Sequence, residues 1–203
     1  MKKVGRIGVF ACLALLFAAC GQAKLPETVD VTSLAVTDDG EVLSYLVDEF
    51  DKDYYSITDL TSMAMEEATE YNESHSDSSD TYPVTVNKVE MLSDSEGKVV
   101  LSHKFDSTET YARYNDQVLF YGTVGDAILA GYDLSGGVKN VKDGSVINEE
   151  QMMQDGGRKV LITDVKAVLY APGRVAAISD GVYNENGTVD TAKAQGNVII
   201  LLK

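Results

Sequence analysis

The sequence predicts an α+β fold with mostly antiparallel sheet, about three helices and a β-rich C-terminal third. Three observations lead to this prediction. Short apolar or alternating runs recur along the chain, the turns between them carry Gly, Asn or Asp, and three stretches open with a residue that can cap a helix. Runs of hairpins interrupted by a few helices are typical of this class.

Two hairpins are expected in the first half of the chain. Residues 29–36 and 41–47 read as strands joined by the turn Asp38-Asp39-Gly40, and residues 84–92 and 98–105 read as a second pair. Further strands are expected at 118–121, 138–141, 159–165, 167–170, 175–179 and 197–202. These make about ten strands, and no helix pattern interrupts the last of them.

Three helices are expected. Ser56 can cap a helix that continues to about residue 73, because Ile57, Leu60, Ala64 and Ala68 recur at three- and four-residue steps. Residues 106–115 open with a pattern like a capping box, and residues 123–131 end at a glycine.

The length and composition fit one domain. The chain has 203 residues, of which 44% are hydrophobic and 24% charged, enough apolar residues for a substantial core. We expect a single domain over residues 29–203. A split near residue 135, into an α+β half and a β half, is the alternative.

The first residues read as a targeting segment. Lys2, Lys3 and Arg6 precede an uncharged, mostly apolar run of 13 residues that ends at Ala19. A helix of that length spans about 20 Å, whereas the hydrocarbon core of a bilayer is about 30 Å thick. The pattern therefore favours a signal peptide over residues 1–19 rather than a permanent membrane-spanning helix.

The end of this segment, Phe17-Ala18-Ala19-Cys20, resembles the lipobox of bacterial lipoprotein precursors, although Phe17 stands where Leu is usual. The resemblance implies cleavage between Ala19 and Cys20 and a diacylglyceryl group on the Cys20 thiol. Residues 20–28 would then form a lipidated tether that holds the body on the extracytoplasmic face of the cell membrane. The alternative is an ordinary secretory signal cut after Ala19.

Charge restricts the partners of this body. Three of the 17 basic residues and none of the 32 acids precede Cys20, so the chain from Cys20 onward has a formal net charge of −18. Nucleic acids and anionic headgroups would repel such a body. We therefore expect membrane contact through the lipid anchor only, and no nucleic-acid partner.

Several stretches are similar to a group of uncharacterised surface lipoproteins of gut Clostridia-type bacteria. They are Asp48–Tyr55 leading into the helix that ends at Tyr71-Asn72, Tyr121–Thr123, Ala130–Asp133 and the turn at Pro172-Gly173. The resemblance would cover most of the mature chain. It implies no activity and no functional residues.

Catalytic patterns are weak, so whether the protein is an enzyme stays undecided, with a leaning towards none. There is no Gly-x-Ser-x-Gly elbow, and of the two histidines His75 lies in a polar loop and His103 on an apolar strand face. Gly122–Gly125 suggests a phosphate loop, but Asp126 would compete with a phosphate there, so a helix cap is the favoured interpretation. We expect no metal and no cofactor.

A non-catalytic binding or interaction module is therefore the leading hypothesis, with a cell-surface glycan or protein as partner. Tyr54, Tyr55, Tyr111 and Tyr114 are the candidate binding residues, although core packing is the favoured role of the last two. The alternative function is a cell-wall or glycan hydrolase with an Asp/Glu pair. Two carboxylates converging in a cleft would favour the hydrolase, whereas a tyrosine-lined pocket without such a pair would favour binding.

Overall fold

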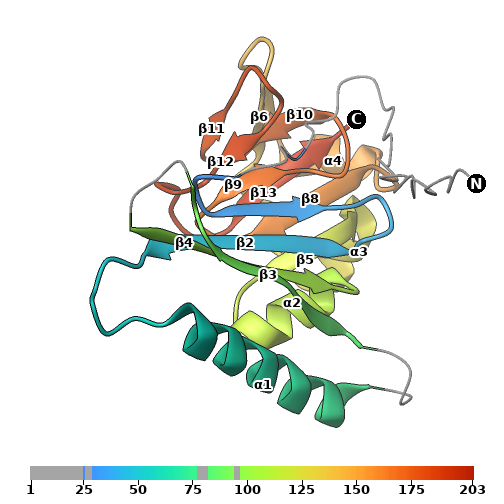
Figure 1. The fold of residues 1–203 in the computed structure, drawn as a ribbon. Helices are drawn as coiled ribbons and strands as arrows, with labels where there is room; N and C mark the ends of the chain where they lie inside the picture. Colours follow the sequence, from blue (N-terminus) through green and yellow to red (C-terminus); the bar gives the residue numbers. More distant parts are fainter. Residues whose placement is uncertain (1–24, 26–28, 77–81, 94–96) are drawn as a thin grey trace, which may run out of the picture.

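A computed structural model of the chain describes residues 25, 29–76, 82–93 and 97–203 (Figure 1). Its elements follow one another in the order β1 (Ser33–Val36), β2 (Val42–Glu49), α1 (Ile57–His75), β3 (Val84–Met91), β4 (Lys98–Phe105), α2 (Thr108–Asn115), β5 (Leu119–Thr123), α3 (Val124–Leu129), β6 (Val138–Asn140), β7 (Val146–Ile147), α4 (Glu149–Gln154), β8 (Lys159–Thr163), β9 (Val168–Tyr170), β10 (Val175–Ile178), β11 (Val182–Tyr183), β12 (Val189–Asp190) and β13 (Val198–Leu202).

The strands form two sheets. Sheet A has seven strands in the order β11-β12-β9-β1-β2-β4-β3, and sheet B has six in the order β5-β8-β13-β10-β6-β7. Every pair among the described residues is antiparallel except β1 with β9. The predicted α+β class with mostly antiparallel sheet and a β-rich C-terminal part is confirmed.

Both predicted hairpins of the first half are present in sheet A. β1 pairs with β2 across a turn in which Gly40 has φ of 86°, a left-handed conformation that costs glycine little. β3 pairs with β4, and the register shifts between Val86 and Lys88. A bulge of this kind on an edge strand blunts pairing with another chain.

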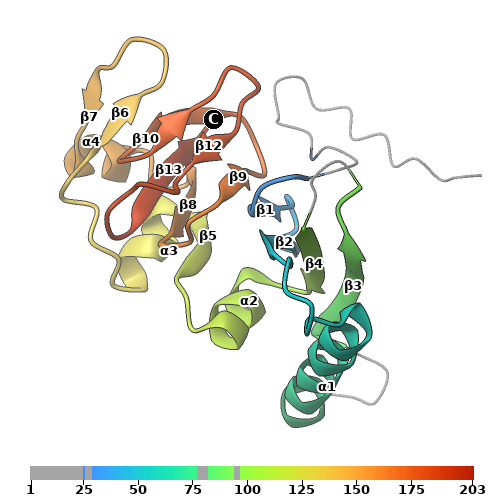
Figure 2. The same cartoon turned by 60° about the vertical axis from the view of Figure 1, so that its left-hand side comes forward.

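The helix α1 packs along β3 at the edge of sheet A (Figure 2). Ser56 caps it by accepting a hydrogen bond from the Asp59 amide at 3.2 Å, as the sequence predicts. Its buried residues are Ala64, Ala68 and Asn72. The Asn72 side chain donates to the Val84 carbonyl at 2.8 Å and accepts from the Val84 amide at 2.9 Å, which joins the helix to the edge strand.

Sequence reasoning missed α4 and the two-residue strands β7, β11 and β12. The α4 helix has six residues, too few to show helical periodicity, but it carries a capping box. The Asn148 side chain accepts from the Gln151 amide, and the Gln151 side chain accepts from the Asn148 amide. The spacing of Asn148 and Gln151 was the available signal for this helix.

The main hydrophobic core lies between the two sheets and draws on the whole chain. Leu34 and Phe105 of sheet A belong to the same cluster as Ile200 and Leu202 of sheet B. The cluster therefore takes residues from both sides of position 135.

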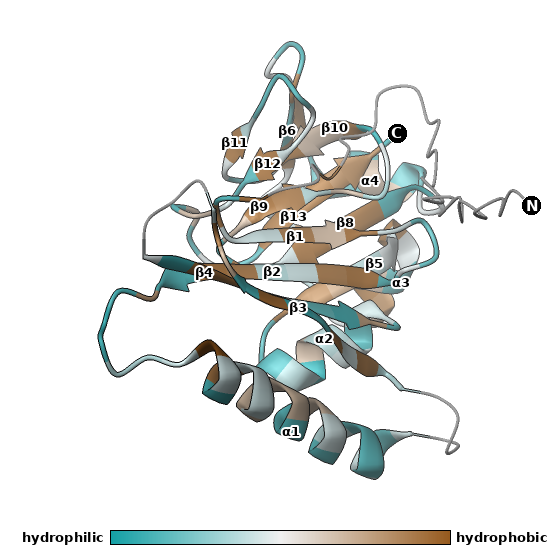
Figure 3. Cartoon of the chain, viewed as in Figure 1, coloured by the Kyte–Doolittle hydropathy of each residue, from teal (hydrophilic) through white to brown (hydrophobic). Residues whose placement is uncertain are grey.

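A second core lies on the opposite face of sheet B, where α3 and α4 cover it. Val124 and Met152 of these helices pack in one cluster with Ile199 and Leu201 of β13. Hydrophobic residues accordingly run along β8 and β13, whereas most of α1 is hydrophilic (Figure 3).

Replacing Phe105 with Ala should destabilise the fold by about 3–5 kcal/mol, because its ring is 1% exposed and large-to-small changes in a core lose burial and leave a cavity. The measurement is the free energy of unfolding from denaturant titration. Leu129→Ala, at a side chain 88% exposed, is the control and should change stability by less than about 0.5 kcal/mol. Equal losses in the two variants would contradict this description of the core.

Candidate functional site

Tyr54 and Tyr55 lie in the segment between β2 and α1 and are both exposed, by 79% and 44%. The Tyr55 ring stacks on Phe50, with centroids 4.8 Å apart and planes 29° apart, and the Tyr54 ring meets Tyr55 edge-on at 4.9 Å. We call these three residues the aromatic platform. The Tyr55 amide donates to the Lys52 carbonyl, so a turn fixes the base of the platform.

Acidic residues flank the aromatic platform along the chain. Asp48, Glu49, Asp51 and Asp53 are all exposed, and Lys52 forms an ion pair with Asp51 at 2.8 Å. The two tyrosines of the platform are therefore exposed to solvent within a negatively charged stretch of the chain.

Tyr111 and Tyr114 do not belong to this surface. Tyr111 is 3% exposed, packs edge-on against Phe105 at 5.1 Å and donates its hydroxyl hydrogen to Gln117 at 2.9 Å. Tyr114 is partly buried and packs against the main core, beside Phe105 and His103. Burial raises the pKa of each hydroxyl to about 12. The favoured core-packing role of Tyr111 is therefore confirmed and its candidate role at a binding surface is wrong, because its helix face packs against β4.

His103 is also a core residue. It is 9% exposed, and its ring lies 5.9 Å from that of Phe105 and 5.7 Å from that of Tyr114. Its Nε2 atom has no hydrogen-bond partner among the described residues. Burial lowers the pKa of the imidazole, and the Glu67 carboxylate offsets this only in part. His103 is therefore a packed, neutral histidine, as the sequence favours.

A pocket of about 260 Å³ lies where β6, β10 and β11 meet. Its lining consists of Lys139, Asn140, Val141, Ile178, Ser179, Asp180, Gly181 and Tyr183. These residues come from two short stretches, 139–141 and 178–183, and no motif in the sequence indicates them. The pocket contains a single carboxylate, Asp180, and not the pair that glycoside hydrolysis requires.

The Asp180 carboxylate has a structural role. Its oxygens accept hydrogen bonds from the backbone amides of Gln195, at 2.9 Å, and of Gly181, at 2.7 Å. These two bonds lower the pKa of the carboxyl group. A general acid needs a raised pKa, so this group is unsuited to protonate a leaving group.

Other carboxyl groups also have lowered pKa values. Hydroxyl and amide donors of nearby residues lower the pKa of Asp126, Asp133 and Asp143, with Thr123, Ser135 and Ser145 as the respective donors. In each case the carboxylate caps a helix or a turn. These carboxylates are thus engaged in local structure.

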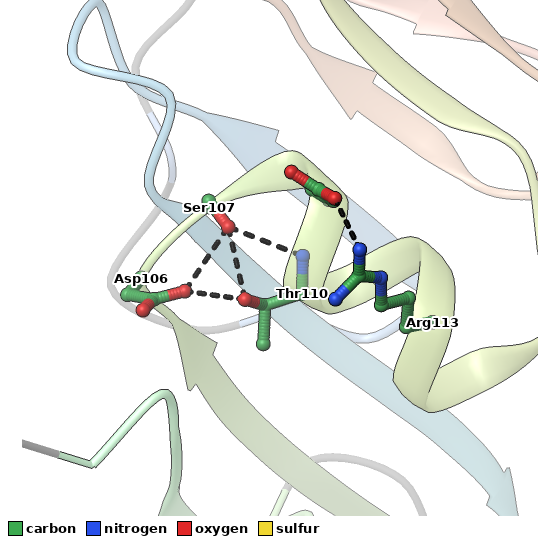
Figure 4. Close-up of polar contacts among 5 residues, drawn as sticks. Asp106, Ser107, Thr110 and Arg113 are labelled. Atoms are coloured by element: carbon green, nitrogen blue, oxygen red, sulfur yellow. Dashed lines mark hydrogen bonds and ion pairs between the residues drawn. The ribbon is translucent and has the colours of Figure 1, made fainter. Parts of the chain in front are cut away.

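The start of α2 gathers hydroxyl and carboxylate groups that can be mistaken for a site (Figure 4). Ser107 accepts from the Thr110 amide, and Asp106 accepts from the hydroxyls of Ser107 and Thr110. An Arg113–Glu109 pair at 2.6 Å lies one turn further along. These contacts cap and support the helix.

The glycine-containing loop before α3 is also a cap. Thr123 and Asp126 form a capping box, in which the Asp126 carboxylate accepts from the Thr123 amide at 3.0 Å. The Asp126 carboxylate therefore already accepts the amide hydrogen that a phosphate would need. The structure thus supports the favoured interpretation of Gly122–Gly125.

Some predictions fall outside the described residues, among them Ala19, Cys20, the signal peptide and most of the tether. Within the described ranges, no group of three or more His, Cys, Asp or Glu side chains is placed to hold a metal ion. In that same part of the chain, no helix has the length and apolar character that crossing a membrane requires.

No protein-family model, no curated protein and no solved structure matches this chain.

The buried His103 should make stability depend on pH. The unfolded imidazole has a pKa of about 6.5, and burial lowers the folded value. The stabilisation is complete above about pH 6.5 and is lost as the pH falls towards the folded pKa, because the unfolded chain takes up a proton that the folded chain excludes. We expect the free energy of unfolding to fall between pH 7.5 and 5.5.

The slope of the free energy of unfolding against pH should be smaller in His103→Gln. It should be retained in His75→Gln, which changes an exposed histidine. An imidazole titration by NMR in the unmodified protein gives a second reading, independent of whether His103→Gln folds. A folded-state pKa for His103 above 6.5 would contradict the burial argument.

Proposed function

We propose that this protein is a lipid-anchored, extracytoplasmic binding module without a catalytic role. The observation that supports it most is the aromatic platform, because Tyr54 is 79% exposed and its neighbouring ring is stacked and held in place. Exposed, preorganised aromatic groups are the usual anchors of binding surfaces. The rings suit the flat face of a cell-surface glycan or an aromatic or basic group of a partner protein.

The anchor is part of the same proposal. The basic start, the short apolar run and Ala19-Cys20 support cleavage before Cys20 and lipidation of its thiol. A body with a net charge of −18 gains no attraction from anionic lipid headgroups. Two acyl chains on Cys20 would supply stable attachment on their own.

The hydrolase alternative gains no support from the pocket. Its only carboxylate, Asp180, accepts two backbone hydrogen bonds and has a lowered pKa. A binding role needs no such group to be available for proton transfer.

The double variant Tyr54→Ala/Tyr55→Ala should weaken binding to cell-wall or surface-protein fractions at least tenfold, since loss of a central aromatic anchor costs about 2 kcal/mol or more. Co-sedimentation of the mature, lipidated protein in detergent with insoluble cell walls measures binding to a glycan. Pull-down with solubilised surface proteins measures binding to a protein partner. Tyr82→Ala, at a tyrosine 65% exposed outside the platform, is the matched control. Equal binding by the double variant and the control would remove the platform from the proposal.

Cys20→Ala should abolish lipid attachment, so that the protein is released or stays as the unprocessed precursor. Cell fractionation shows where the protein is, and mass spectrometry of the mature N-terminus shows whether Cys20 carries added lipid. A Cys20→Ala protein that is processed and membrane-bound like the unmodified one would refute the anchor.

A further inference from the structure

The pocket between β6, β10 and β11 combines an apolar floor with a polar rim. Val141, Ile178 and Tyr183 are partly buried and pack against the main core, so the floor is fixed by the fold. Pockets for drug-sized ligands measure about 300–1,000 Å³, and this one measures about 260 Å³. Its size fits a single six-membered ring with its substituents.

The rim offers more donors than acceptors. Neither the Lys139 ammonium nor the Tyr183 hydroxyl has a hydrogen-bond partner among the residues that the structure describes. Ser179 accepts from the Ile199 amide at 2.8 Å, so its own hydrogen can be donated. The Asp180 carboxylate is the main acceptor, and its ionised oxygens retain lone pairs after two backbone bonds.

The turn that carries Asp180 depends on a glycine. Gly181 has φ of +92°, and a Cβ atom there would lie 2.7 Å from the Asp190 carbonyl oxygen. Any larger residue would shift the turn. The turn at Gly181 therefore sets the positions of Asp180, which precedes it, and of Tyr183, which follows it.

The lining charges balance, with one ammonium at Lys139 and one carboxylate at Asp180. An anionic ligand would face Asp180, and a cationic one would face Lys139. An uncharged ring with several hydroxyl groups avoids both repulsions, because each hydroxyl can accept from one group and donate to the other. We infer that this pocket is a binding site for a single uncharged sugar ring, seated against Tyr183 with its hydroxyls on Lys139 and Asp180.

This inference is separate from the role of the aromatic platform and goes beyond it. The test titrates methyl glycosides of glucose, galactose and N-acetylglucosamine into the mature, lipidated protein in detergent, with saturation-transfer NMR as the readout. At least one glycoside should bind with a millimolar or tighter dissociation constant. Lys139→Gln, an exposed position, should weaken that binding at least fivefold.

Lys142→Gln is the matched control, because Lys142 lies three residues further along and outside the pocket lining. It should bind like the unmodified protein, and so should Tyr54→Ala/Tyr55→Ala. Saturation transfer from none of the glycosides, or equal binding by the two lysine variants, would overturn the inference. Binding of free glycine or alanine in place of the glycosides would also overturn it and would assign the pocket to a zwitterion.

Discussion

The fold depends on the burial of β13 on both of its faces. All five residues of this strand are buried, with Val198, Ile200 and Leu202 in the core between the sheets and Ile199 and Leu201 in the core under α3 and α4. The last strand in sequence therefore holds a central position in sheet B, between β8 and β10. Because no cysteine follows Cys20, no disulfide between residues beyond it can replace this packing.

The sequence indicated those elements whose signals are local. The turn glycine at 40 and the capping serine at 56 each mark a boundary within a few residues, and both are found where they were expected. The two-residue strands carry no period at all, since alternation needs about four residues to be visible. The parallel contact of β1 with β9 joins residues more than 130 positions apart, which no local pattern can indicate.

The candidate binding residues show the same limit. The spacing of Tyr111 and Tyr114 places them on one face of a helix, but spacing does not tell whether that face meets solvent or a sheet. In the structure it meets β4, and the rings join His103 and Phe105 in the core. Tyr54 and Tyr55 precede a helix cap and stay exposed because the chain turns there, outside both cores. The pocket residues gave no signal, since they converge from separate strands.

Net charge sets the kind of ligand that this body can hold. With 18 net negative charges from Cys20 onward, anionic molecules are repelled over a Debye length of about 8 Å at physiological salt. Acidic side chains around the aromatic platform add to that repulsion locally, whereas Lys139 balances Asp180 within the pocket. Uncharged ligands do not experience this repulsion. Ring contacts and directed hydrogen bonds, which salt does not screen, would contribute to their binding. The proposed contacts follow this constraint, because the charge is balanced at the pocket and aromatic rings would carry the contact at the platform.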